Sequence, residues 1–184
     1  MIDFMVDEET GLIGGVEKVV VRIVDYDADW PKKFEVHRRI IAGTLGEAAL
    51  GIEHIGSTSV PGLAAKPIID ILVVVHDSTD ESQYLPQLEA AGYELRVREP
   101  EWNEHRMFRT PEKDVHVHVY SNDCPEIQRN LSFRDRLRSN VEERQRYEQT
   151  KRELAKREWS DMNDYANAKT EMIESILSRC RGLV

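Results

Sequence analysis

A hydroxyl-rich loop and an acidic residue follow one another closely in this chain, and their types suit phosphate and metal chemistry. The loop consists of Gly56, Ser57, Thr58 and Ser59. Lys66 follows the loop, and Asp70 then interrupts the apolar run at residues 68–75. Small residues offer backbone N–H groups and hydroxyls to an anion, and a carboxylate within a buried strand needs a partner such as a metal ion. The segment therefore predicts a phosphate-binding loop beside a metal-binding carboxylate.

A purely structural interpretation of this segment stays open. A Gly-Ser pair after a strand also occurs in ordinary strand-to-helix turns. Asp70 could hold a loop by accepting backbone N–H bonds, and Lys66 could be a surface lysine before a proline.

Two histidines alternate with valines in residues 114–120, which indicates a strand with two different faces. His116 and His118 share one face. Two histidines at this spacing can chelate a divalent metal, and imidazole suits zinc, iron, copper or nickel better than magnesium. With Asp70 they would form a mixed nitrogen and oxygen site, or His118 could act as a general base. The alternative is that both histidines lie on a half-exposed sheet face, hydrogen-bonded to neighbours.

These residues resemble the signature of the GrpB-like family, which belongs to the nucleotidyltransferase superfamily. The segments that resemble it are HIGSTSVPGLAAKPIID at 54–70, YDADWPKKF at 26–34, DVHVHV at 114–119, LSFRDRLR at 131–138 and the helices at 147–169. The resemblance spans residues 18–177. It implies a mixed β-sheet in which a Gly-Ser pair precedes a strand with two acids one residue apart. Those acids bind the metals that position a nucleoside triphosphate.

One position departs from this pattern. Gly56, Ser57 and Asp70 match, but the second acid is expected at position 72, where the chain has Leu72. A two-metal transfer site needs several anionic ligands, so this departure favours a binding module without transfer chemistry. The nearest other acids are Glu53, Glu101 and Glu104.

The residue patterns and the resemblance together predict roles for individual residues. Asp70 and His118 are the predicted catalytic residues, and Asp70, His116 and His118 are the predicted metal ligands. The predicted phosphate or nucleotide ligands are Gly56, Ser57, Thr58, Ser59, Lys66, Arg134, Arg138, Tyr165 and Lys169. Tyr165 and Lys169 lie four residues apart, so they could stack on a base and contact a phosphate, or equally be a core tyrosine and a rim lysine. The expected cofactor is Mg²⁺ or Mn²⁺, with Zn²⁺ as the alternative.

The composition restricts the partners. The net charge is −9, from 25 Lys+Arg and 34 Asp+Glu, which opposes broad nucleic-acid coating but leaves an RNA end open. The predicted partner is a small-molecule nucleotide or phosphometabolite, and the oligomeric state is left undetermined. No apolar run approaches the roughly 20 residues of a membrane span, the acidic N-terminus lacks a secretion signal, and Cys124 and Cys180 form no motif. A cytoplasmic protein is expected.

Periodicity and turn signals then predict an α+β fold. We expect a flexible segment at 1–16 and a single domain at 17–184, with the sheet core at 17–122 and the C-terminal helices at 126–180. The expected strands are 16–24 as an edge arm, 52–55, 67–75, 93–98 and a hairpin of 105–110 with 114–120; the expected helices are 30–45, 60–65 and 80–91. Asp29 is predicted to cap the first helix, and Ser160 or Asp161 the last. The cleft is expected between the sheet and the C-terminal helices.

Three functions remain open at this point. The first is a nucleotidyltransferase-like enzyme that uses the loop for phosphates and Asp70 for a metal. The second is a non-catalytic nucleotide- or phosphometabolite-binding module, which Leu72 favours. The third is a histidine-based divalent metal site with a hydrolase or sensor role, which His116 and His118 favour.

Overall fold

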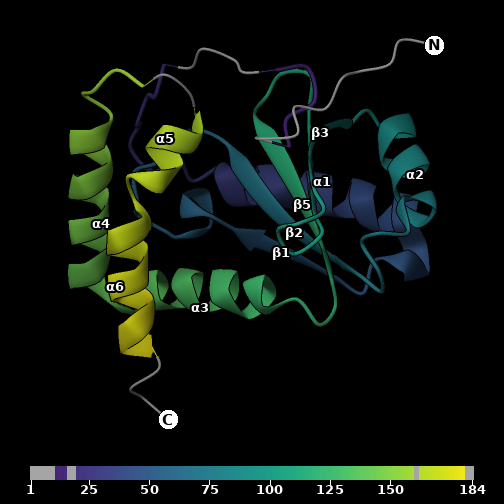
Figure 1. Ribbon diagram of the computed structural model, residues 1–184. Coiled ribbons are helices and arrows are strands. Elements are labelled where there is room, and N and C mark those ends of the chain that lie inside the picture. Colours follow the sequence, from purple (N-terminus) through teal and green to yellow (C-terminus); the bar gives the residue numbers. More distant parts are fainter. Residues whose placement is uncertain (1–10, 16–19, 160–161, 181–184) are drawn as a thin grey trace.

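The computed structural model describes residues 11–15, 20–159 and 162–180, in which a five-stranded mixed sheet carries helices on both faces (Figure 1). The strands are β1 Gly51–Ile55, β2 Ile69–Val75, β3 Glu94–Glu99, β4 His105–Arg109 and β5 Val115–Ser121. The helices are α1 Trp30–Leu45, α2 Leu85–Ala90, α3 Pro125–Ser139, α4 Val141–Leu154, α5 Met162–Asn167 and α6 Thr170–Cys180. The predicted α+β class, with a mixed sheet and a helical C-terminal part, is confirmed.

The two strands that carry the candidate metal ligands lie beside each other within the sheet. The strand order is β1-β2-β5-β4-β3, with β2 and β5 parallel and the other neighbours antiparallel. Asp70 lies opposite His116, and Leu72 lies opposite His118. Because side chains alternate across each strand, Asp70 and both histidines face the same side of the sheet.

One face of the sheet is closed by α1 and α2. The buried side chains of this face are Ile69, Ile71, Val73, Val75, Val115, Val117, Val119 and Phe108 from the strands, with Trp30, Ile41, Leu45 and Leu88 from the helices. Each such side chain stabilises the fold by about 1.5–3 kcal/mol on burial. The valines of β5 therefore face the helices, and the histidines between them are left for the other face, as the alternation predicts.

The other face is covered in part by the C-terminal helices. Leu72, Ile55 and Tyr120 pack there with Ile127 and Leu131 of α3. The helices α3, α4 and α6 meet around Leu137, Tyr147 and Ile176, together with Val60 and Leu63 from the loop after β1. In Figure 1, α3 runs below the strands and α4 and α6 stand at its end. β2 is thus covered on both faces, as its continuous apolar run predicts.

Several elements lie where the sequence places them. Helix α1 spans Trp30–Leu45, with Pro31 in its first turn, where a missing N–H does no harm, and Gly46 at its end. β4 and β5 form the predicted antiparallel hairpin. The predicted helix at 80–91 is shorter: a 3₁₀ turn at Glu81–Gln83 precedes α2, because Pro86 in the first turn of α2 excludes a continuous helix through it.

The predicted cap of α1 is wrong. Asp29 makes no side-chain cap hydrogen bond. Its backbone is helical, at φ −86° and ψ −12°, whereas a capping residue takes an extended conformation. Its carboxylate instead accepts a hydrogen bond from Lys32 Nζ, 2.7 Å away.

The predicted helix at residues 60–65 is also wrong. Ser57–Ser59 forms a single 3₁₀ turn, and Ala65 pairs with Val24 as an isolated β-bridge. Pro61 has no backbone N–H, and Gly62 takes a φ of +76°. A proline is tolerated in a first turn, but the positive φ of Gly62 is not helical, so the segment after the loop is irregular chain.

Some predictions fall outside the described residues. These are most of the flexible segment at 1–16, the start of the arm at 16–24, and the cap by Ser160 or Asp161. Among the described helices, none combines the length and the apolar character that crossing a membrane requires.

Candidate functional site

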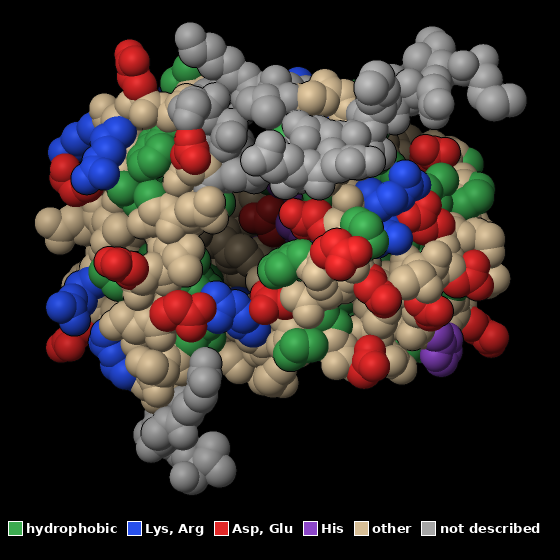
Figure 2. Space-filling model, viewed as in Figure 1, with side chains coloured by type: hydrophobic (Ala, Val, Ile, Leu, Met, Phe, Trp, Pro, Cys, Tyr) green, Lys and Arg blue, Asp and Glu red, His purple; other side chains and the backbone are tan. Residues whose placement is uncertain are grey.

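A cleft of about 670 Å³ lies between the sheet and the C-terminal helices. Figure 2 shows a hollow in the middle of this face, with acidic side chains beside it. The predicted site residues that line the cleft are Gly56, Ser57, Thr58, Lys66, Asp70, His116, His118, Tyr165 and Lys169. The predicted residues absent from its lining are Ser59, Arg134 and Arg138. The structure thus brings most of the predicted site into one space.

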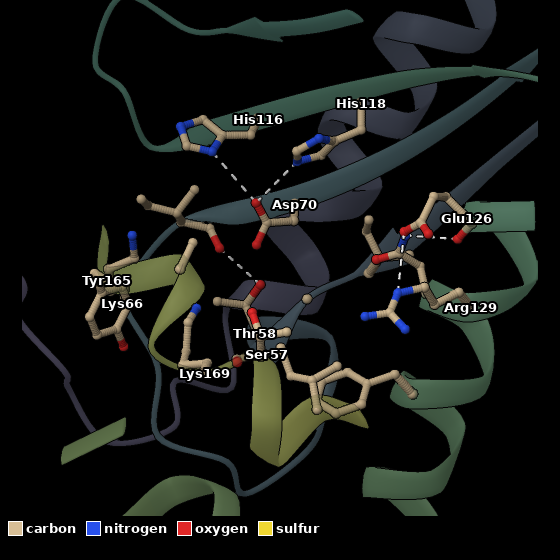
Figure 3. Close-up of a pocket in the computed structure, with 18 of the residues that line it drawn as sticks. Ser57, Thr58, Lys66, Asp70, His116, His118, Glu126, Arg129, Tyr165 and Lys169 are labelled. Carbon is tan, nitrogen blue, oxygen red and sulfur yellow. Dashed lines mark hydrogen bonds and ion pairs between the residues drawn. The ribbon is translucent and has the colours of Figure 1, made fainter. Parts of the chain in front are cut away.

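Asp70 and the two histidines form the centre of the cleft. His116 and His118 project from β5 toward the Asp70 carboxylate on β2 (Figure 3). His116 Nδ1 and His118 Nε2 each lie 3.6 Å from Asp70 Oδ1. Desolvation opposes ionisation of Asp70, whereas the His116 imidazole beside it favours the ionised carboxylate and lowers the pKa of this carboxyl. Asp70 therefore carries a negative charge.

The three side chains suit one metal ion. They offer one carboxylate oxygen and two imidazole nitrogens, and these atoms lie within 4.8 Å of one another. Within the described ranges 11–15, 20–159 and 162–180, they are the single group of three or more such side chains so placed. A set of two histidines and one carboxylate matches known zinc and iron sites. It does not match the all-oxygen, two-metal arrangement that the superfamily resemblance implies.

The loop after β1 packs directly against Asp70. Gly56 has a φ of +67°, and a Cβ added there would lie 2.3 Å from Asp70 Oδ2. Only glycine fits this close approach and this backbone conformation. The glycine of the predicted loop is therefore required by the carboxylate it faces.

The hydroxyls of the loop divide into two groups. The Thr58 hydroxyl donates to Ile68 O at 3.0 Å, and the Ser59 hydroxyl donates to Gly56 O at 2.6 Å. These two hydroxyls therefore fix the loop. The Ser57 side chain lines the cleft, as does Tyr147 on α4.

His54 of β1 contacts the same loop. Its ring stacks on Phe34, with centroids 4.7 Å apart, and its Nε2 lies 3.1 Å from the Thr58 hydroxyl. Burial lowers the pKa of His54 to about 4, so the ring is neutral. These contacts fit an orienting role for His54.

Three lysines converge on the cleft from the other side. Lys66 and Lys169 place Nζ 5.4 and 4.5 Å from the centre of the Tyr165 ring. Lys151 Nζ lies 4.9 Å from the centre of the Tyr147 ring and donates to a backbone carbonyl. Such cation–π contacts stabilise a desolvated ammonium group only in part.

The lysine charges are costly in this environment. Burial lowers the pKa of Lys66, and lowers that of Lys151 to about 7 and that of Lys169 to about 8. The charge of Lys169 lowers the pKa of Lys151 further, and the charge of Lys66 does the same to Lys169. A polyanion between these ammonium groups would remove this repulsion. The lysine side of the cleft is therefore suited to phosphate.

Tyr165 is buried and has little surface left for a nucleobase. It is 1% exposed and packs with Leu154 and Trp159. Figure 3 shows Lys66 and Lys169 on the same side of the cleft as its ring. Of the two alternatives drawn from the sequence, the core tyrosine fits these contacts better.

The two predicted phosphate-binding arginines are engaged elsewhere. Arg134 Nη1 lies 2.7 Å from Glu53 Oε2 and also donates to His54 O. Arg138 donates to Ser59 O from two nitrogens, at 3.0 and 2.8 Å. Both side chains attach α3 to β1 and its loop, so these contacts are structural, and a phosphate role for them stays a prediction.

Sequence reasoning missed three residues beside the histidines. Glu99, Trp102 and His105 line the cleft. His105 Nε2 lies 3.0 Å from His118 Nδ1, and His105 Nδ1 lies 2.7 Å from Glu99 Oε2. The signal was the predicted hairpin, because counting its register outward from the turn puts His105 on the same face as His118. Lys151 was also missed as a residue that lines the cleft, although it lies one helical turn after Tyr147.

The second acid of the superfamily pattern has no substitute on β2. Leu72 is fully buried in an apolar cluster with Ile55 and Tyr120. Of the other acids considered, Glu53 pairs with Arg134, and neither Glu101 nor Glu104 lines the cleft.

Comparison with known proteins agrees with the motifs. The profile of the family described as GrpB protein matches residues 20–179. A UPF0157 protein from Streptomyces coelicolor is 53% identical over 168 residues, which cover 91% of this chain and 88% of that protein. The crystal structure of conserved protein GrpB from Enterococcus faecalis aligns with a TM-score of 0.77 at 35% identity, over 86% of this chain and 96% of that chain. The chain belongs to the GrpB family.

A weaker likeness extends to the structure of Cid1 in complex with its short product ApU. The TM-score is 0.43 at 17% identity, over 63% of this chain and 39% of that chain. A match at this level carries no argument about the present site.

Proposed function

We propose that this protein binds a nucleoside triphosphate, or a related phosphorylated metabolite, together with one divalent metal ion. The metal is held by Asp70, His116 and His118, and the phosphates lie between that ion and the lysine side of the cleft. The observation that carries the proposal is the presence of both groups in one cleft, with the Gly56-Ser57 loop between them.

The charges of the cleft support this ligand class. A metal ion at Asp70 adds positive charge to a space that already holds Lys66, Lys151 and Lys169. Such a space attracts a polyanion strongly and a neutral ligand little. Ser57 also lines the cleft, so its hydroxyl could donate to a phosphate oxygen.

Two of the three functions that the sequence left open are therefore compatible with each other. The histidine-based metal site and the nucleotide pocket are parts of one cleft, so they need not be alternatives. Leu72 favours binding through a single metal over two-metal nucleotidyl transfer, because its side chain belongs to the core. A His118 that ligates the metal through Nε2 is not free to act as a general base, so the proposal takes ligation over the base role that the sequence left as its alternative.

A thermal-shift screen tests this proposal. Nucleoside triphosphates, nucleoside monophosphates and coenzyme A are each combined with Mg²⁺, Mn²⁺ or Zn²⁺. A ligand at about 100 times its Kd stabilises by about 2.7 kcal/mol, which corresponds to a rise in Tm of about 5 °C or more. We expect a metal-dependent rise with triphosphates that is lost in Asp70→Asn.

The matched control is Asp77→Asn, because Asp77 is exposed outside the cleft and pairs with Thr79. It should behave as the wild type. No shift with any phosphate compound under any of the metals would contradict the proposal. Product formation from a bound triphosphate would show that binding leads to turnover.

A further inference from the structure

A chain of hydrogen-bonded side chains leads from the rim of the cleft to the metal-binding residues. Glu99 Oε2 lies 2.7 Å from His105 Nδ1, and His105 Nε2 lies 3.0 Å from His118 Nδ1. His118 Nε2 then faces Asp70 Oδ1 at 3.6 Å. Glu99 ends β3, His105 begins β4, and the two residues are paired across these antiparallel strands.

The rings of this chain are held from several sides. The His105 ring stacks on the His118 ring at 5.3 Å and on the Tyr120 ring at 4.8 Å between centroids. Trp102 covers the His105 ring edge-on at 5.4 Å. The turn before His105 is fixed by the bond from His105 N to Trp102 O, at 3.1 Å. His105 is 6% exposed, so its orientation is set by packing as well as by its two hydrogen bonds.

Counting protons along the chain assigns the tautomer of His118. The Glu99 carboxylate accepts the Nδ1–H of His105, which leaves His105 Nε2 as an acceptor. His105 Nε2 then accepts the Nδ1–H of His118, so His118 Nε2 carries a lone pair. In the opposite tautomer, His118 would direct an Nε2–H at the Asp70 carboxylate. The distance from His118 Nε2 to Asp70 Oδ1 would then shorten to about 2.8 Å, as in a charged hydrogen bond. The observed 3.6 Å fits two metal ligands better than a donor and its acceptor.

We propose that Glu99 and His105 hold His118 as an Nε2 ligand and so make this cleft a site for a transition-metal ion such as Zn²⁺ or Co²⁺, selected over Mg²⁺. The inference rests on the metal site of the proposed function. A carboxylate that polarises a ligating histidine raises its basicity and fixes its ring, and loss of such a partner weakens metal binding. Mg²⁺ prefers six oxygen ligands in octahedral geometry and gains little from imidazole. His105 is a positioning residue in this account.

Cobalt(II) is the probe for the test, because its visible absorption bands report the ligands and the geometry. Co²⁺ is titrated into metal-free wild type and into His105→Phe, which keeps the ring stacking but removes the acceptor for His118. We expect His105→Phe to bind Co²⁺ about 10- to 100-fold more weakly and to show a shifted absorption band. His105→Gln should recover part of the affinity, because its amide oxygen can accept from His118 Nδ1.

Two further variants make the result specific. Glu99→Gln should lose less Co²⁺ affinity than His105→Phe, because it removes the negative charge but keeps a side-chain oxygen that accepts from His105 Nδ1. His37→Gln is the matched control, because His37 is a half-buried histidine paired with the Tyr93 hydroxyl at 2.7 Å, outside the cleft lining. Thermal unfolding without metal checks that each variant folds, and the Gln variants carry the test if His105→Phe does not fold.

Wild-type affinity and a wild-type spectrum in His105→Phe would overturn the inference and leave the proposed function standing. Displacement of Co²⁺ by millimolar Mg²⁺ would also overturn it. If the wild type takes up no more Co²⁺ than Asp70→Asn, the proposed metal site itself fails, and the inference fails with it.

Discussion

Gly56 is the residue where the backbone comes closest to the candidate metal ligand. We predict that Gly56→Ala destabilises the fold and weakens metal binding, because its Cβ would lie 2.3 Å from Asp70 Oδ2. Backbone strain of this kind costs about 1–3 kcal/mol, and displacement of Asp70 adds to it. Urea unfolding and Co²⁺ titration measure the two effects.

The control for this variant is Gly62→Ala. Gly62 also has a positive φ, of +76°, but a Cβ there would meet nothing within 4 Å. It should lose stability from backbone strain alone and keep the metal affinity of the wild type. Equal effects of the two substitutions would contradict the close packing of loop and carboxylate.

The buried lysines make a prediction about protons. Because the pKa of Lys151 is lowered to about 7 and that of Lys169 to about 8, both are partly neutral at pH 8 in the free protein. A bound polyphosphate favours their charged forms and raises both pKa values, so binding takes up protons between pH 7 and pH 9. We expect an uptake of about one proton per ligand at pH 8, measured by calorimetry in buffers of different ionisation enthalpy.

Lys151→Met should reduce this uptake. Lys156→Met serves as the control, because Lys156 pairs with Glu153 on an exposed surface and does not line the cleft. Release of protons on binding, or binding without any exchange of protons, would argue that the lysines do not contact the ligand.

At the scale of the element, β2 carries both the metal ligand and the position of the missing acid. Leu72→Asp would supply the second carboxylate of the superfamily pattern. We predict that it destabilises the protein by about 3–5 kcal/mol, because an unpaired charge would enter an apolar cluster. Metal stoichiometry should stay at one.

Leu72→Met is the matched substitution, with an expected cost below about 1.5 kcal/mol. Urea unfolding and metal analysis of the two variants distinguish the cases. A stable Leu72→Asp protein that binds two metal ions would show that the fold accommodates the two-metal arrangement after all.

The elements of the fold were largely predictable from the sequence, while the contacts between them were not. The boundaries of α1 and the β4–β5 hairpin followed from periodicity and turn residues, and the alternation in β5 placed its histidines on the cleft side. The segment at 60–65 was misassigned because its apolar residues suit a helix, whereas Gly62 takes a positive φ and Ala65 pairs with Val24. Tertiary context decided that case.

The side chains that neighbouring strands bring together in the candidate site could be predicted from the sequence. The partners that the arginine side chains choose could not. Asp70, His116 and His118 could be grouped from the pattern alone. Arg134 pairs with Glu53, and Arg138 donates to Ser59 O. Both contacts depend on how α3 packs against β1, and the sequence pattern does not predict that packing. The pairing of His105 with His118 follows from the register of the β4–β5 hairpin, which its turn residues indicate in the sequence.

At the scale of the whole molecule, the cleft joins two parts of the chain. The sheet supplies the carboxylate and the imidazoles, and the turn between α5 and α6 supplies Lys169 (Figure 3). Helix α4 supplies Tyr147 and Lys151. A ligand that contacts both sides would couple them, so metal and phosphate should bind cooperatively. Cooperativity between two ligands is reciprocal by thermodynamic necessity.

Equilibrium dialysis of a nucleoside triphosphate with and without Mn²⁺, on the wild type and on Asp70→Asn, tests the central claim most directly. The comparison with Asp70→Asn separates protein binding from chelation of the metal by the nucleotide in solution. We predict that Mn²⁺ tightens triphosphate binding to the wild type at least tenfold, about 1.4 kcal/mol, and does so in the wild type alone. A triphosphate affinity that is the same with and without the metal, or the same in both proteins, would contradict the account.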